Sequence, residues 1–205
     1  FQIDKLRHRF GLERVILVGD RGMITEARLR EELSAVAGLC WISALRGPAI
    51  RELSQKGDIQ LSFFDQRDLV EITSPDYPGE RLICCHNPLL AIERVRKREE
   101  LLQETEKELN KIVAATQREK RRLKGKSKIG LRIGKVLQRY KVGKHFKLEI
   151  TEDEFSYRRA DEKIAAEAAL DGIYVVRTSV SADTLNADET VRRYKDLSAV
   201  EQAFR

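Results

Sequence analysis

The sequence predicts an α/β fold that is interrupted by a mixed α+β insertion with a long helix. Short apolar runs alternate with a helical stretch near the N-terminus, a long charged stretch fills the middle, and an apolar run returns near the C-terminus. Strand, helix and strand in this order favour parallel pairing. We expect three parts: residues 1–48 with the first half of the sheet, an insertion at 49–170, and a return segment at 171–205.

The first part carries the clearest strand signals. Residues 1–10 have roughly helical apolar spacing, and "RVILV" at 14–18 is a continuous run rich in β-branched residues. Such a run is typical of a strand buried on both faces. Thr25 is a suitable N-cap for a helix "EARLREELSAV", and "GLCWISALRG" at 38–47 predicts a second buried strand.

The first half of the predicted insertion contains a hairpin and a long helix. "DLVEIT" at 68–73 and "ERLICCH" at 80–86 are joined by the turn-rich "SPDYPG". A highly charged helix is expected from Pro88 to about Leu123. Its apolar heptad positions are broken at Thr116, which favours one helix packing on a partner over a coiled coil.

The remaining elements follow from periodicity and turn residues. In order, we expect a basic helix at 128–140, two hairpin strands at 145–150 and 154–159, a short helix at 161–170, a buried strand at 173–179 and one or two helices over 187–205.

Composition limits the possible settings of the protein. No apolar run approaches the roughly 18 residues that span a bilayer. The three cysteines, Cys40, Cys84 and Cys85, give no disulfide framework, which favours a reducing, cytoplasmic location. The adjacent Cys84, Cys85 and His86 lack a second ligand pair, so we expect buried strand residues and no zinc site. Since the sequence starts at Phe1, we expect a piece of a longer protein.

Positive charge is concentrated in one segment. Residues 118–147 hold 13 Lys or Arg and a single acid, Glu119, so this window carries +12 while the rest of the chain sums to −6. A cluster of this kind suits a polyanion such as DNA, since each neutralised phosphate releases counterions. A solvated basic face or a flexible linker is the alternative. The residues expected to contact DNA here are Arg121, Arg122, Lys124, Lys126, Lys128, Arg132, Lys135 and Arg139.

Two acidic positions are candidates for chemistry. Asp20 follows the strand "RVILV" by one glycine, where open α/β sheets place their sites. Its alternative role is a local Asx turn or helix cap. In the C-terminal segment "YKDLSAVEQAFR", Tyr194, Leu197 and Glu201 would share one helix face. An amphipathic terminal helix with an exposed acid is the alternative there.

Taken together, these segments resemble the DDE transposases of bacterial insertion sequences. The resemblance rests on "VGDRGM", on "DGIYVVRTS" and on a C-terminal Y-x2-L-x3-E-x2-F-R. The family has a ribonuclease-H-like core with a largely β insertion and a Y-x2-R-x3-E-x6-K signature. Tyr194 and Glu201 fit this signature, Leu197 stands where the arginine is most often found, and the lysine would lie beyond Arg205.

The resemblance implies DNA transposition by metal-dependent cleavage and strand transfer. Asp20 would be the second acid of the triad and Glu201 the third. Both would hold Mg²⁺, with Mn²⁺ as a substitute, in a pair of ions about 4 Å apart. Tyr194 and Arg205 would contact the DNA backbone. The expected partners are transposon ends and target DNA, with a homodimer of the full-length protein in the synaptic complex and no membrane.

The same resemblance implies that this fragment is incomplete. The family's first acid lies on a strand that would precede residue 1. We therefore expect a partial ribonuclease-H-like core that lacks about three strands, has an exposed sheet edge and is inactive alone. Two other functions stay open. One is a non-catalytic DNA-binding or scaffold module that uses residues 118–147, and the other is a ribonuclease-H-like nuclease that cleaves without strand transfer.

Overall fold

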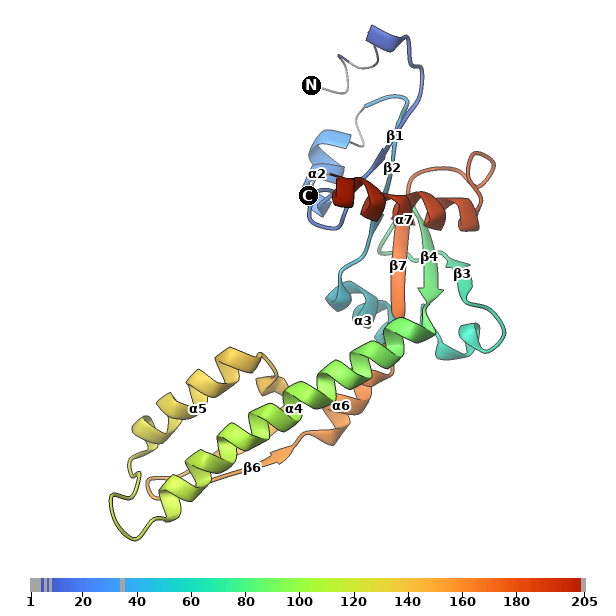
Figure 1. The fold of residues 1–205 in the computed structure, drawn as a ribbon. Coiled ribbons are helices and arrows are strands. Elements are labelled where there is room, and N and C mark those ends of the chain that lie inside the picture. Colours follow the sequence, from blue (N-terminus) through green and yellow to red (C-terminus); the bar gives the residue numbers. More distant parts are fainter. Residues whose placement is uncertain (1–4, 6, 8, 34–35, 204–205) are drawn as a thin grey trace. The chain divides into compact units, whose positions relative to one another are not determined.

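The computed structural model describes residues 5, 7, 9–33 and 36–203, without the side chains of Arg30, Glu32 and Glu201. The chain forms two compact units (Figure 1). The sheet unit comprises Phe1–Asn87 and Ile173–Arg205, and the helical unit comprises Pro88–Gly172. Residues 49–87 therefore fold with the first 48 residues, so the predicted insertion at 49–170 does not correspond to one compact unit.

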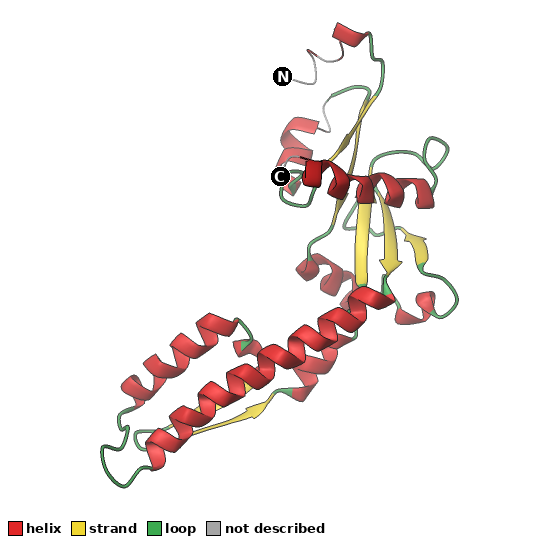
Figure 2. Ribbon diagram, in the orientation of Figure 1, coloured by secondary structure: helices red, strands yellow, loops and turns green. Residues whose placement is uncertain are grey.

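The sheet unit contains a mixed five-stranded sheet in the order β1-β2-β7-β4-β3, drawn as arrows in Figure 2. The predicted parallel pair is confirmed, as is the predicted hairpin that is joined by a turn. The return strand lies antiparallel between these two pairs. The strands are β1 (Val15–Val18), β2 (Leu39–Ala44), β3 (Leu69–Ile72), β4 (Arg81–His86) and β7 (Ile173–Thr178). The fold class is α/β.

The prediction that residues 14–18 are buried on both faces is wrong. Ile16 in β1 is 37% exposed. Within the described residues β1 pairs only with β2 and stands at one end of the sheet, so its outer side is not covered by another strand.

Helices cover both faces of the sheet. Helix α7 (Ala187–Ala203) packs through Val191 and Tyr194 against a cluster that includes Ile42 and Val176. On the other face, Trp41 packs with Ile24, Leu29 and Leu33. These last residues belong to or flank α2 (Glu26–Arg28) and a π-helical turn, η1 (Leu29–Leu33). Thr25 caps α2 as predicted, accepting a hydrogen bond from the Arg28 N–H. The unit also contains α3 (Gly47–Lys56) and η2 (Leu61–Phe64).

The N-terminal helix expected at residues 1–10 is described in part. Residues 5, 7, 9 and 10 are helical, and the others in this range lie outside the described residues. Arg7 fixes this segment by donating to the carbonyl of Ala37 at 2.7 Å.

The helical unit packs two helices and a hairpin around a separate core. Its main buried side chains are Leu102, Leu109, Ile129, Ile133, Phe146 and Phe155. Its elements are α4 (Pro88–Gln117), α5 (Lys126–Tyr140), η3 (Gly143–His145), β5 (Phe146–Ile150), β6 (Phe155–Arg159) and α6 (Asp161–Ala168).

The predicted elements of this unit are confirmed, except that the long helix ends earlier than expected. It ends at Gln117 and not near Leu123. The chain turns back because Arg121 adopts a positive φ of 55° and the Leu123 N–H donates to the Ala115 carbonyl at 2.9 Å.

A buried ion pair links the first helix of the helical unit to the last residues of that unit. The guanidinium of Arg98 on α4 binds both carboxylate oxygens of Asp171, and the two side chains are only 9% and 7% exposed. A second arginine, Arg159 on β6, binds both Glu99 and Glu106 on α4. Charged contacts of this kind are stabilising only while both partners are present.

We expect Arg98→Ala to lower the free energy of unfolding by about 3–5 kcal/mol, because the Asp171 carboxylate would be left buried without its cation. Arg96→Ala is the matched control, since Arg96 lies on the same helix in an exposed pair with Glu100. It should cost no more than about 1 kcal/mol. Urea unfolding of both variants measures the difference, and equal losses would contradict the assigned role of the buried pair.

Two glycines inside α5 lower the stability of that helix. A Cβ placed on Gly130 or Gly134 would meet no described atom within 4 Å. We therefore expect Gly134→Ala to stabilise the chain by roughly 0.5–1 kcal/mol, since alanine orders at lower entropic cost in a helix. Thermal unfolding tests this. Gly143→Ala, where the new methyl would approach Leu137 at 3.3 Å, should give no such gain.

Candidate active site and nucleic-acid interface

Asp20 lies at the carboxyl end of β1, in a tightly packed turn. The preceding Gly19 is buried, and its N–H donates to the Ile42 carbonyl at 3.1 Å. A Cβ on Gly19 would lie 2.8 Å from Ile24 Cγ1, so this position requires glycine or a shift of Ile24. Ser43 Oγ donates to the Asp20 carbonyl at 3.3 Å. The strand pair thus holds the backbone of Asp20 firmly.

The Asp20 carboxylate forms an Asx turn, which is the alternative role that its sequence position predicts. Its Oδ1 accepts hydrogen bonds from the N–H groups of Gly22 at 2.9 Å and Met23 at 2.6 Å. Oδ2 receives no hydrogen bond from the described residues. The turn therefore orients the carboxylate and leaves one of its oxygens available, so a structural and a chemical role are compatible.

Asp20 shares a surface hollow with α7. The hollow has a volume of about 280 Å³, and besides Asp20 it is lined by Tyr194, Lys195, Leu197 and Ser198. The structure thus brings Asp20 together with Tyr194, the first residue of the C-terminal signature. Glu201 lies in α7 one turn beyond Leu197, but its side chain is not described, and Arg205 lies outside the described residues.

The start of α7 is fixed by contacts that the sequence analysis missed. Asn186 and Glu189 form a capping box, in which each side chain accepts the backbone N–H of the other, at 2.9 and 3.1 Å. The sequence pattern Asn-x-x-Glu before a helical stretch is sufficient to predict this capping box. Arg81 donates to the carbonyls of Val180 and Leu185, both at 2.9 Å, and pairs with Glu71. These contacts set where α7 crosses the sheet.

The described residues supply only part of a metal site. They contain no group of three or more His, Cys, Asp or Glu side chains able to hold an ion. Asp20 offers one hard oxygen ligand of the type that Mg²⁺ prefers, which is too few for a pair of ions. Cys84 and Cys85 are poor ligands, because burial raises the pKa of Cys84 to about 12 and that of Cys85 to about 11.

A continuous basic face lies on α5. Lys128, Arg132, Lys135 and Arg139 are exposed and follow one another at intervals of four, three and four residues. Ile129 and Ile133, on another side of the helix, are buried in the core of the unit. At 1.5 Å per residue, this face is about 16 Å long. We call these four side chains the α5 basic face.

The other four residues of segment 118–147 that are predicted to contact DNA differ in whether their side chains face solvent. Arg121, Lys124 and Lys126 are exposed, and Lys124 lies 3.8 Å from Asp153. Arg122 instead folds inward and donates to the carbonyls of Thr116 and Asp153. Its main contacts are therefore within the helical unit.

Comparisons with known proteins returned nothing for this chain. No protein-family model, no curated protein and no solved structure matches it.

In the part of the chain that the structure describes, no helix is both long enough and apolar enough to cross a membrane.

Proposed function

We propose that the chain is part of the catalytic domain of a DDE transposase, with a partial ribonuclease-H-like core. The proposal is supported by a parallel strand pair that ends in Asp20 and by a C-terminal helix that covers the same sheet. The "DGIYVVRTS" segment forms β7, which packs against that helix through Val176 and Tyr174. DNA as the substrate would place the protein in the cytoplasm.

The main support for the proposal is the hollow that Asp20 shares with α7. Asp20 and the start of this helix at Ala187 are 167 positions apart in the sequence, yet Tyr194 and Leu197 line the same 280 Å³ space as Asp20. Residues four apart stack on one helix face, so Glu201 follows Leu197 along α7. In the proposal, Asp20 and Glu201 are two of the acids, and no described residue supplies the third.

The chemistry assigns a distinct task to each residue. Asp20 and Glu201 would hold a pair of Mg²⁺ ions, which would supply the activation of a water or a 3′-hydroxyl and the stabilisation of the leaving oxygen. Asp20 presents Oδ2 from a turn that is already closed by Gly22 and Met23, so little motion is needed to place a ligand there. Tyr194 at the edge of the hollow contacts a backbone phosphate, and the α5 basic face holds DNA through further phosphates.

A strand-joining assay tests the proposal. The full-length protein is incubated with Mg²⁺, a labelled duplex with a free 3′-hydroxyl end and a supercoiled plasmid. We expect labelled plasmid as the product, and chelation of the metal should abolish it. Cleavage without joining would favour the ribonuclease-H-like nuclease, and no metal-dependent reaction at all would contradict a catalytic role.

A second candidate is a non-catalytic DNA-binding or scaffold module. It is favoured by the α5 basic face, which belongs to a compact unit with its own core. This candidate requires salt-sensitive DNA binding that is unaffected by Asp20→Ala and by divalent metal. The transposase proposal requires the same binding and, in addition, the metal-dependent joining reaction.

A further inference from the structure

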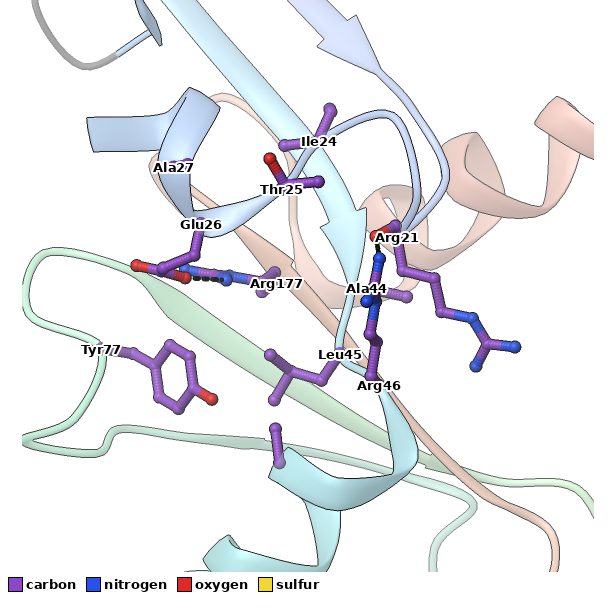
Figure 3. Close-up of a pocket in the computed structure, with 11 residues that line it drawn as sticks. Arg21, Ile24, Thr25, Glu26, Ala27, Ala44, Leu45, Arg46, Tyr77 and Arg177 are labelled. Carbon is purple, nitrogen blue, oxygen red and sulfur yellow. Dashed lines mark hydrogen bonds and ion pairs between the residues drawn. The ribbon is translucent and has the colours of Figure 1, made fainter. Parts of the chain in front are cut away.

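A second pocket lies on the face of the sheet opposite α7. It has a volume of about 360 Å³ and contains Arg177, whose guanidinium lies 5.1 Å from the Trp41 ring on the α2 side of the sheet (Figure 3). The Asp20 hollow lies on the α7 side. The two spaces are thus distinct, although both adjoin the carboxyl end of β1.

One flank of this pocket carries more negative than positive charge. Arg177 is buried and pairs with Glu80 and Glu26, with its Nη1 at 2.7 Å from Glu26 Oε2. Tyr77 stacks 4.9 Å from the same guanidinium. Figure 3 shows the Glu26–Arg177 pair and Tyr77 on this side. Because two carboxylates face one cation, this flank has a net charge of −1, and any excess positive charge must come from the other flank.

The other flank carries two cations without an acidic partner. Arg21 follows β1 and Arg46 follows β2, and both are exposed. They lie side by side in Figure 3, and Arg46 Nη2 donates to the Arg21 carbonyl at 3.2 Å. No described carboxylate lies within ion-pair distance of either guanidinium. The hydrogen bond restrains Arg46, while the Arg21 guanidinium extends outward.

The backbone at this flank adds to the positive potential. Helix α3 begins at Gly47, directly after Arg46, and no side chain caps its first turn. Ala49 in that turn lines the pocket. The N-terminus of a helix attracts anions through its free N–H groups and its dipole. Arg21, Arg46 and the start of α3 therefore line one concave site, and the Arg21 guanidinium extends outward from it.

We propose that this pocket binds a phosphate group, held by Arg21 and Arg46. Guanidinium groups bind phosphate oxygens through paired hydrogen bonds, and two arginines with no acidic partner among the described residues favour an anion over a neutral ligand on this flank. The phosphate is either a free anion or a terminal phosphate of a nucleic acid. The site does not depend on the transposase proposal, since it uses neither Asp20 nor the α5 basic face.

Calorimetric titration of the whole chain tests this site with two probes. The first is inorganic phosphate, and the second is a short single-stranded oligonucleotide with or without a 5′-phosphate. Arg21→Gln combined with Arg46→Gln should weaken phosphate binding by about tenfold or more, because two charge-assisted contacts are lost. Arg51→Gln combined with Arg67→Gln removes the same charge from exposed positions of the same unit, outside the pocket, and should leave binding unchanged.

The results with the two probes distinguish the two possible sources of the phosphate. Tighter binding of the 5′-phosphorylated oligonucleotide identifies a nucleic-acid end as the source, while binding of inorganic phosphate without that gain identifies a free anion. If the wild-type chain shows no saturable binding, or if both double variants lose it equally, the site does not exist. Arg21→Gln alone serves if the double variant fails to fold, since the described structure gives the Arg21 side chain no bond to lose. It should weaken binding several-fold, and unchanged binding would overturn the assignment.

Discussion

Asp20→Asn in the full-length protein should reduce strand joining by at least about a thousandfold, because a neutral amide cannot hold the metal pair that stabilises the leaving oxygen. The substitution is well matched to the structure. An asparagine amide oxygen can accept the same hydrogen bonds from Gly22 and Met23 that Asp20 Oδ1 accepts. The turn should therefore persist, and the loss would be chemical.

Two further variants complete this experiment. Glu201→Gln should cause a comparable loss, since it removes the second proposed ligand. Asp196→Asn on the same helix should leave joining unchanged, because Asp196 is 58% exposed and pairs with Arg193 at 3.7 Å outside the hollow. Thermal unfolding serves as the check on folding. Normal joining by Asp20→Asn would remove Asp20 from the catalytic site and leave it as a turn residue.

Local patterns predicted most elements of the fold. The spacing of apolar residues, every second residue in strands and about every 3.6 residues in helices, was sufficient to predict the hairpin strands, α5 and α7. These elements form according to which of their faces is apolar. The two errors have physical causes outside such patterns. The exposure of Ile16 depends on the place of β1 at the end of the sheet, and the early end of α4 depends on the turn at Arg121 and on the hydrogen bond from Leu123 to Ala115.

The long-range contacts around the two pockets of the sheet unit could not be predicted from local sequence patterns. Arg177 meets Glu80 and Glu26 across 97 and 151 residues, and Arg81 meets the Leu185 carbonyl across 104. No periodicity relates such positions, because they become neighbours only when the sheet order is set. Asp20 and Tyr194 were linked through the family resemblance, and the structure places them in one hollow.

Neutralising the α5 basic face should weaken binding of duplex DNA by about a hundredfold or more near 0.1 M salt. The variant replaces Lys128, Arg132, Lys135 and Arg139 with Gln. If these side chains neutralise four phosphates, the slope of log K against log salt should fall by about 3.6. Fluorescence anisotropy across a salt series measures both quantities in the 205-residue chain.

The control must remove the same charge from the same unit. Arg96, Lys97, Lys107 and Lys111 on α4 are exposed, and each is paired with a glutamate on that helix. Their replacement with Gln should change affinity by less than about tenfold, since balanced cations release few counterions. Equal losses from both sets would show that net charge, and not the α5 face, governs binding. A selective loss would assign DNA to this face, and strand joining would then decide between a scaffold and an enzyme.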